Sequence, residues 1–369
     1  MTPLRLALCA LAALAFAACA PSSQNSDTEI VSGHVADVVQ IGQHVAPNGA
    51  SAPFQELRVQ LDDSLYRGDV VELEWDGKHG LDANAYLKTG DRVLMSVSRQ
   101  GNDRSYTIQE VVRLPSLIPI AVVLVLALLV IARLRGLTAL AGLVLSVTIF
   151  LLAVVPAIRT GGDPLVSTLL GSVAASALTV FVVHGVSRRS LLAIGGTFAG
   201  LGIATAAGAA AIAATRLSGV GTDEQVALAL SASGGVDMPR LALAGMMVGS
   251  LGAIVDMSLG QVWTTLRLAR ADDMLRGRRL FLAAVDAARD HLASLVNTLA
   301  LAYFGASLPT VLLVWLGTTP SDIALNSEPI AAVLGAVIAA SLGVIATVPV
   351  TAAITTLFAG AAEPAPFED

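Results

Sequence analysis

Long apolar segments fill the chain from residue 114 to residue 360 and constrain its fold more than any other feature. A transmembrane helix needs about twenty consecutive, mostly apolar residues. Seven stretches meet this requirement, and we expect each to cross a bilayer: 115–132, 137–157, 165–183, 191–215, 240–260, 292–316 and 329–358. Only 14% of the residues are charged, against about 25% in soluble domains, so the sequence predicts an integral membrane protein.

Arginines are distributed unevenly between the loops on the two sides of these spans. One set of alternate loops carries Arg133, Arg135, Arg188, Arg189, Arg267, Arg270, Arg276, Arg278, Arg279 and Arg289. The other set carries only Arg159, Arg216 and Arg240. Because cytoplasmic loops are enriched in Lys and Arg, we expect the first set in the cytoplasm, with the lipid bilayer of a bacterial inner membrane around the spans. The N-terminal part is then extracytoplasmic and the C-terminal tail, 361–369, cytoplasmic.

The first twenty residues have the layout of a secretory signal, with Arg5 followed by an apolar run and small residues. Ala17-Ala18-Cys19 resembles a lipobox in which Cys19 would be lipidated, although Phe16 stands where an aliphatic residue is preferred. Lipidation of Cys19, ordinary cleavage and an uncleaved anchor all remain open. Residues 21–28 form a polar tether in each case. Cys9 and Cys19 are the only cysteines, which excludes a disulfide or a thiolate site in the rest of the chain.

Residues 29–113 show a two-residue hydrophobic alternation that is interrupted by turn residues. Strands are expected at 31–39, 56–61, 70–75, 92–97 and 106–112. Five short strands in a segment of this length predict a small barrel of the OB type or a similar one. The three histidines His34, His44 and His79 lack the spacing of metal ligands, so we expect neither a metal nor another cofactor. No basic patch with interleaved aromatic residues is present, so nucleic acid is not an expected partner.

Polar side chains inside the expected spans are the candidate functional residues. An ionisable group there costs at least about 2.5 kcal/mol, so each is a functional candidate. We expect a polar cluster near the cytoplasmic face, formed by Asp256, Asn297, Thr298, Asp290 and His184. In this hypothesis Asp256 accepts a proton or cation and Asn297 is its neutral partner. The alternative is a buried hydrogen-bonded contact between the fifth and sixth spans.

Glycines recur three or four residues apart in the fourth and fifth spans. The positions concerned are Gly196, Gly200, Gly245, Gly249 and Gly252. Glycine at this spacing lets helix backbones approach closely, so we expect helix packing there, with a pore lining as the alternative. Pro156 and Pro349 are expected to kink the second and seventh spans. Assembly into a homo-oligomer is left open.

Several linked motifs identify a family. Asn297–Tyr303, which reads Asn-Thr-Leu-Ala-Leu-Ala-Tyr and follows Arg289-Asp290, resembles a motif of the YibE/F-like membrane proteins. The segment Gly249-x-x-Gly252-Ala253-x-x-Asp256 is similar to a second one, and His184-Gly185 with Gly196-Thr197, and Pro349–Ala352, agree with the same family. The resemblance covers about residues 30–358. Departures are Ala287-Ala288, where a glycine-containing pair is expected, and His291, where an aliphatic residue is usual.

The resemblance implies a multi-pass inner-membrane protein and leaves its activity open. We interpret the chain as a transporter or channel for a small ion or solute. The alternative is a membrane-anchored scaffold or sensor whose extracytoplasmic domain binds an envelope partner. An intramembrane hydrolase is disfavoured because no Gly-x-Gly-Asp motif of aspartyl proteases precedes Asp256 or Asp290. A Walker loop is also absent, so we do not expect the chain to hydrolyse ATP by itself.

Overall fold

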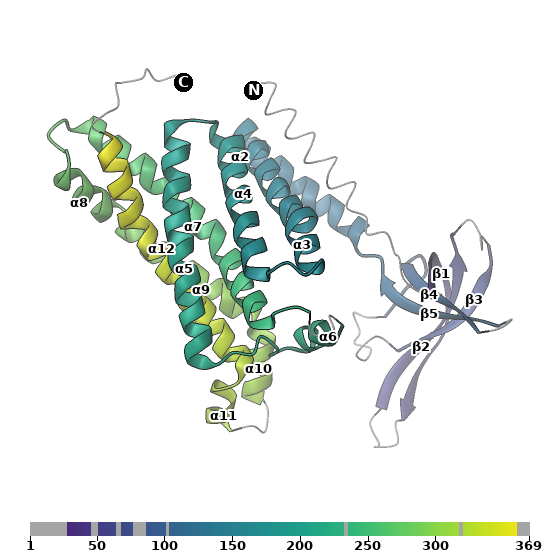
Figure 1. Ribbon diagram of the computed structural model, residues 1–369. Helices are drawn as coiled ribbons and strands as arrows, with labels where there is room; N and C mark the ends of the chain where they lie inside the picture. The colour runs from purple at the N-terminus through teal and green to yellow at the C-terminus, as the bar shows by residue number, and fades with distance from the viewer. Residues whose placement is uncertain are drawn as a thin grey trace. The chain divides into compact units, whose positions relative to one another are not determined.

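The protein is described by a computed structural model that covers residues 28–45, 51–63, 68–76, 86–100, 103–231, 235–316 and 320–359. The expected signal, the lipidation site Cys19 and the C-terminal tail lie outside these residues. The chain divides into two compact units, one of Pro21–Ile131 and one of Ala132–Asp369 together with Met1–Ala20. Each unit is considered by itself (Figure 1).

The first unit contains an antiparallel five-stranded sheet. Its strands are β1 (Thr28–Val45), β2 (Ser51–Leu61), β3 (Val70–Trp75), β4 (Arg92–Gln100) and β5 (Asp103–Val111). The strand order is β3-β2-β1-β4-β5. The long β1 pairs with β4 through Thr28–His34 and with β2 through Gly33–Val45. The edge strands β3 and β5 also contact each other, although they are not hydrogen-bonded neighbours. The described strands therefore form a sheet that is curved into a half-barrel.

Alternating side chains of the sheet form the core of this unit. Val31, Val35, Leu57 and Met95 are fully buried on its inner face, as two-residue periodicity requires. Gln55 is also buried, and its side-chain amide donates to the Leu87 carbonyl at 3.1 Å while its oxygen accepts from the Leu87 N–H at 2.8 Å. This pair of hydrogen bonds fixes the chain that leads into β4 to the start of β2.

Helices form the rest of the structure. They are α2 (Leu114–Ile149), the π-helix η1 (Phe150–Val154), α3 (Val155–Arg159), α4 (Pro164–His184), α5 (Arg188–Thr215), α6 (Asp223–Ser231), α7 (Met238–Ala271), α8 (Arg278–Ala287), α9 (Arg289–Ala306), α10 (Leu308–Leu316), α11 (Ser321–Leu325) and α12 (Glu328–Ala359). α2 breaks at Arg133, where the backbone is left-handed (φ 53°), which separates the first two expected spans. The π-turn of η1 directly precedes Pro156, where a kink is expected.

Among the described residues, six helices are long and apolar enough to cross a membrane. They are Leu114–Arg133, Gly136–Arg159, Pro164–His184, Arg188–Thr215, Met238–Ala271 and Glu328–Phe358. The expected sixth span, 292–316, is not one continuous helix, because it breaks at Ser307 between α9 and α10. Pro309 gives the physical reason, since its ring would clash with the Gly305 carbonyl four residues earlier in an unbroken helix.

Contacts between helix termini show which ends lie together. Arg240 in the first turn of α7 forms an ion pair with Asp163, the N-cap of α4. The Glu328 carboxylate, at the start of α12, accepts hydrogen bonds from the Ser218 hydroxyl and the Gly219 N–H, just after α5. A Cβ added at Gly219 would meet the Met238 carbonyl at the start of α7. The starts of α4, α7 and α12 and the end of α5 therefore lie together, at what we call the Asp163 end.

The opposite end, where α5, α8 and α9 begin, is the Arg188 end. Because α7 finishes at the Arg188 end and α12 starts at the Asp163 end, α9 and α10 must return the chain between them. Figure 1 shows these two helices following one another beside α12. The break at Ser307 therefore interrupts a path that still runs the length of the helical unit.

Charge is compensated at the Asp163 end. The pKa of Asp163 is lowered, first by the hydrogen bond from the Val166 N–H and then by the hydrogen bond and positive charge of Arg240. The same carboxylate accepts from the Leu165 N–H at 2.9 Å, so it caps α4 and binds α7 at once. The Asp163 carboxylate therefore stays ionised at lower pH than an ordinary aspartate does.

Candidate functional site

The centre of the helical unit is a junction of α5, α7 and α12 where small residues meet hydroxyl groups. Thr347, Thr351 and Thr355 stand four apart on α12 and are fully buried. A Cβ added at Gly196 would collide with the Thr351 hydroxyl, and one added at Gly200 with the Thr347 hydroxyl. The fully buried Ser258 of α7 donates to the Ala193 carbonyl of α5 at 2.5 Å and lies 3.5 Å from the Thr351 hydroxyl. The absence of a side chain at Gly196 and Gly200 therefore makes room for hydroxyls in the core.

The glycines of α7 behave differently from one another. A Cβ on Gly249 would collide with the Tyr303 hydroxyl of α9, whereas a Cβ on Gly245 or Gly252 would meet nothing within 4 Å. Gly245, Gly252 and Asp256 lie on the exposed side of α7, at the spacing of one helix face. A single copy of the chain thus leaves part of the glycine face uncovered, and Asp256 lies on it.

Asp256 is exposed and makes no hydrogen bond or ion pair with any residue that the structure describes. Counted back from Arg267 at 1.5 Å per residue, it lies about 16 Å inside the arginine-rich part of α7. An unpaired carboxylate at this depth is costly where lipid surrounds it. Asn297 is exposed as well, and no hydrogen bond joins it to Asp256 in the described part of the chain.

Asn297 and Thr298 nevertheless lie at a comparable depth. The Tyr303 hydroxyl of α9 donates to the Met246 carbonyl of α7 at 3.4 Å, which fixes the antiparallel register of the two helices. In that register Asn297 lies within about one helical turn of the level of Asp256. The Thr298 hydroxyl donates to the Ser294 carbonyl at 2.9 Å, so its proton is bound within α9. Two adjacent antiparallel helices therefore carry exposed polar groups at one level.

The other two residues of the expected cluster lie closer to the Arg188 end. Asp290 is in the first turn of α9, seven residues before Asn297, and His184 is the last residue of α4. The structure therefore places Asn297 and Thr298 about one helical turn from the level of Asp256, whereas Asp290 and His184 lie at the helix ends. Among the described residues, no group of three or more His, Cys, Asp or Glu side chains is arranged to hold a metal ion.

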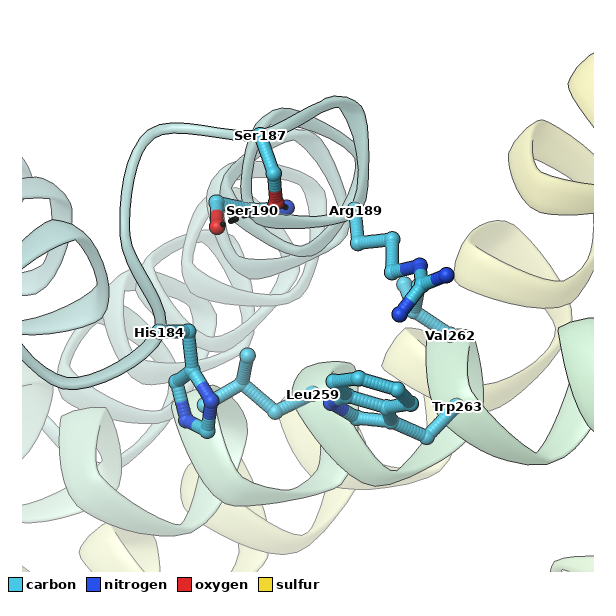
Figure 2. A pocket seen from close by; sticks show the side chains of 7 residues that line it. All are labelled: His184, Ser187, Arg189, Ser190, Leu259, Val262 and Trp263. Carbon is cyan, nitrogen blue, oxygen red and sulfur yellow. Dashed lines mark hydrogen bonds between the residues drawn. The ribbon is translucent and has the colours of Figure 1, made fainter. Parts of the chain in front are cut away.

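His184 instead lines a cavity of about 160 Å³ at the Arg188 end (Figure 2). Its walls come from the link between α4 and α5 and from one face of α7: His184, Ser187, Arg189, Ser190, Leu259, Val262 and Trp263. The Arg189 guanidinium lies 4.8 Å from the centroid of the Trp263 ring. Sequence reasoning assigned Arg189 to membrane topology and gave Trp263 no role, because the two are far apart in the chain and neither belongs to a motif.

The model of the YibE/F-like protein family matches residues 120–361. The chain belongs to the YibE/F-like family. The family resemblance drawn from Asp256, Asn297 and the terminal Pro349 segment is thereby confirmed. No curated protein and no solved structure matches the chain.

Membership of the YibE/F-like family, together with the six apolar helices, establishes an integral membrane protein. The matched region contains both candidate sites, the Asp256 face of α7 and the cavity beside Arg189, and leaves the β-sheet outside it. Chemistry common to the YibE/F-like proteins is therefore to be sought in the helical unit.

Proposed function

We propose that this YibE/F-like protein is a transporter or channel for a small ion or solute. The observation that carries the proposal is Asp256, an exposed and unpaired carboxylate and the only acidic residue within α7. Intramembrane carboxylates commonly mark ion pathways and proton relays. Asn297 and Thr298, at the same level on the antiparallel α9, supply neutral oxygen ligands beside the same route.

The exposure of this face supports a route that a second copy of the chain completes. In one copy Asp256 and the open glycines Gly245 and Gly252 lie on the surface of α7. A small-residue face lets a neighbouring helix approach, and the approach would enclose Asp256 between protein surfaces and remove it from lipid. The proposal therefore includes a homo-oligomer.

The proposed topology has seven crossings, with α9 and α10 together forming the sixth. The N-terminal domain is then extracytoplasmic and the C-terminus cytoplasmic, and the Arg188 end, rich in arginine, faces the cytoplasm of a bacterial inner membrane. The strand order β3-β2-β1-β4-β5, with β3 in contact with β5, is consistent with an OB-type barrel left open between those two strands. Export by the signal at residues 1–20, with lipidation at Cys19, belongs to the same proposal.

The test is proton and ion flux into proteoliposomes. Asp256→Asn keeps the shape of the side chain and removes its charge, so flux is expected to fall at least about tenfold while protein yield and helix content stay unchanged. The matched control is Asp273→Asn, which removes an exposed carboxylate from the link between α7 and α8 and is expected to leave flux unchanged. Equal flux in wild type and Asp256→Asn would exclude a role for Asp256 in transport.

A scaffold or sensor is the second candidate function, and the outer face of the sheet favours it. Ile30 on β1 and Leu94 on β4 are 57% and 37% exposed on the face opposite the core. Apolar side chains on a sheet face offer a docking surface for an envelope partner. Absence of flux for all common ions in both proteins, together with co-purification of a stable partner that Ile30→Ser abolishes, would favour this function over transport.

A further inference from the structure

We propose that the cavity between α4, α5 and α7 at the Arg188 end binds a phosphate group. Two sources share this chemistry, the headgroup of an anionic phospholipid and free inorganic phosphate. The inference does not depend on transport through the Asp256 face, because it rests on different residues. It follows from the charge of the lining, the state of Arg189, the start of α5 and the size of the cavity.

The lining excludes a cation and suits an anion. Its polar members are Arg189, His184, Ser187 and Ser190, and none of the seven lining residues is acidic. The remaining wall, made of Leu259, Val262 and Trp263, is apolar except for the indole N–H. The charged group in the lining is therefore positive, and it attracts anions into the cavity.

Arg189 is held ready for such a ligand. The central carbon of its guanidinium lies over the Trp263 ring, 4.8 Å from the ring centroid. Figure 2 shows the side chain extending from α5 toward the indole across the cavity. It forms no ion pair or hydrogen bond with any residue in the described part of the chain. Such a cation–π contact holds a guanidinium in place and leaves its N–H groups available for the oxygens of a phosphate. Trp263 thus positions the Arg189 guanidinium, and no acidic side chain among the described residues neutralises its charge.

The start of α5 contributes a second group of donors. Ser187 is the N-cap, and its hydroxyl accepts the Ser190 N–H at 3.2 Å. The backbone N–H groups of Arg188 and Arg189, in the first turn, have no partner among the described residues. A helix of 28 residues carries a partial positive charge at this terminus, which favours an anion beside the free N–H groups.

One of the two serine hydroxyls in the lining, that of Ser187, can turn its proton toward a ligand. Ser190 donates to the Gly185 carbonyl at 2.6 Å, which uses its only proton. Ser187, 3.0 Å from the Ser190 hydroxyl, therefore either donates to that oxygen or donates to a phosphate in the cavity. Rotation of the Ser187 hydroxyl is therefore enough for it to donate to a bound phosphate.

Size and position fit a phosphate group. A water molecule occupies about 30 Å³ of liquid, so 160 Å³ holds a hydrated tetrahedral oxyanion but not an entire phospholipid. A lipid would therefore place only its headgroup inside and leave its chains along the apolar side. Trp is enriched at membrane interfaces, and basic pockets between helices at the cytoplasmic side bind lipid headgroups, so the position suits either source.

The test measures binding to the purified full-length protein after removal of bound lipid. The probes are inorganic phosphate, short-chain phosphatidylglycerol and short-chain phosphatidylcholine, and the readout is quenching of Trp263 fluorescence in a Trp75→Phe, Trp315→Phe background. Arg189→Gln is expected to weaken binding at least about tenfold, and Arg189→Lys less, since it keeps the charge and loses the stacked plane. The matched control is Arg188→Gln, which removes an exposed charge one residue away that does not line the cavity.

The arms of the experiment separate the outcomes. Tight binding of phosphatidylglycerol that phosphate displaces only weakly identifies a headgroup site, and saturable binding of phosphate without preference for the lipid identifies a free-phosphate site. Both support the proposal if Arg189→Gln abolishes them and Arg188→Gln does not. Absence of binding by every probe would overturn the proposal. Equal losses of binding in Arg189→Gln and Arg188→Gln would overturn it as well, because they would mean unspecific attraction of anions to the arginine-rich end.

Discussion

At the scale of single residues, glycine at the α5–α12 contact decides whether the central helices can pack. A methyl group at Gly196 would collide with the Thr351 hydroxyl, whereas one at the adjacent Gly195 would meet nothing within 4 Å. We therefore expect Gly196→Ala to destabilise the protein by about 1–3 kcal/mol, as over-packing of a core does. Thermal unfolding in detergent, followed by size exclusion, measures the change.

Gly195→Ala is the matched control for this prediction. It introduces the same methyl group one residue away, where alanine in a helix interior is favoured over glycine by about 1 kcal/mol. Its unfolding temperature should equal or exceed that of the wild type. Equal losses in Gly195→Ala and Gly196→Ala would mean that backbone flexibility, rather than the close contact with Thr351, is what the glycines provide.

The same scale shows what the sequence could reveal of the candidate sites. Asp256 and Asn297 could be found because a polar group stands out in an apolar run. Arg189 could not, because an arginine at a helix end is already accounted for by membrane topology. Only the fold brings it to Trp263, more than seventy residues later in the chain. A tryptophan near the end of a span, opposite an arginine-rich loop, was the available signal.

At the scale of elements, the lengths of the apolar stretches predicted the membrane-length helices but not the break between α9 and α10. The six membrane-length helices coincide with expected spans, because about twenty apolar residues leave the backbone no alternative to a helix in lipid. The expected span 292–316 keeps its apolarity across Ser307, so hydropathy does not register the break there. Pro309 is the local signal that length alone overlooks, because an interior proline removes a backbone hydrogen bond and kinks or breaks the helix.

The break raises a question of topology that can be measured. Because α7 and α12 start at the same end, we expect α9 and α10 to cross the membrane together and to make seven crossings. A cysteine at Ser321 in α11 should then react with an impermeant maleimide added outside spheroplasts. A cysteine at Asp273 should react only after permeabilisation, and the wild type gives the background from Cys9 and Cys19. Labelling of both positions from the same side would contradict the seventh crossing.

At the scale of the whole molecule, the chain consists of two units with separate cores. The sheet curves around its own apolar cluster, which includes Leu57 and Trp75, and the helices pack around Ile254 and Val344. The alternation of the strands predicted the first core, whereas its openness between β3 and β5 depends on register, which alternation does not specify. Separate cores imply that the units unfold separately.

A fragment of residues 27–113 should therefore fold alone in water, with Trp75 as its only tryptophan and the natural reporter. Leu57→Ala removes a fully buried side chain and should cost the fragment about 2–5 kcal/mol in urea unfolding. Arg58→Ala, its neighbour on the exposed face, breaks only the 2.8 Å ion pair with Glu72 and should change stability little. In the full-length protein, Leu57→Ala should shift the sheet's transition and leave that of the helices in place. A shift of both transitions would show that the helical unit depends on the sheet, and independent unfolding would then be wrong.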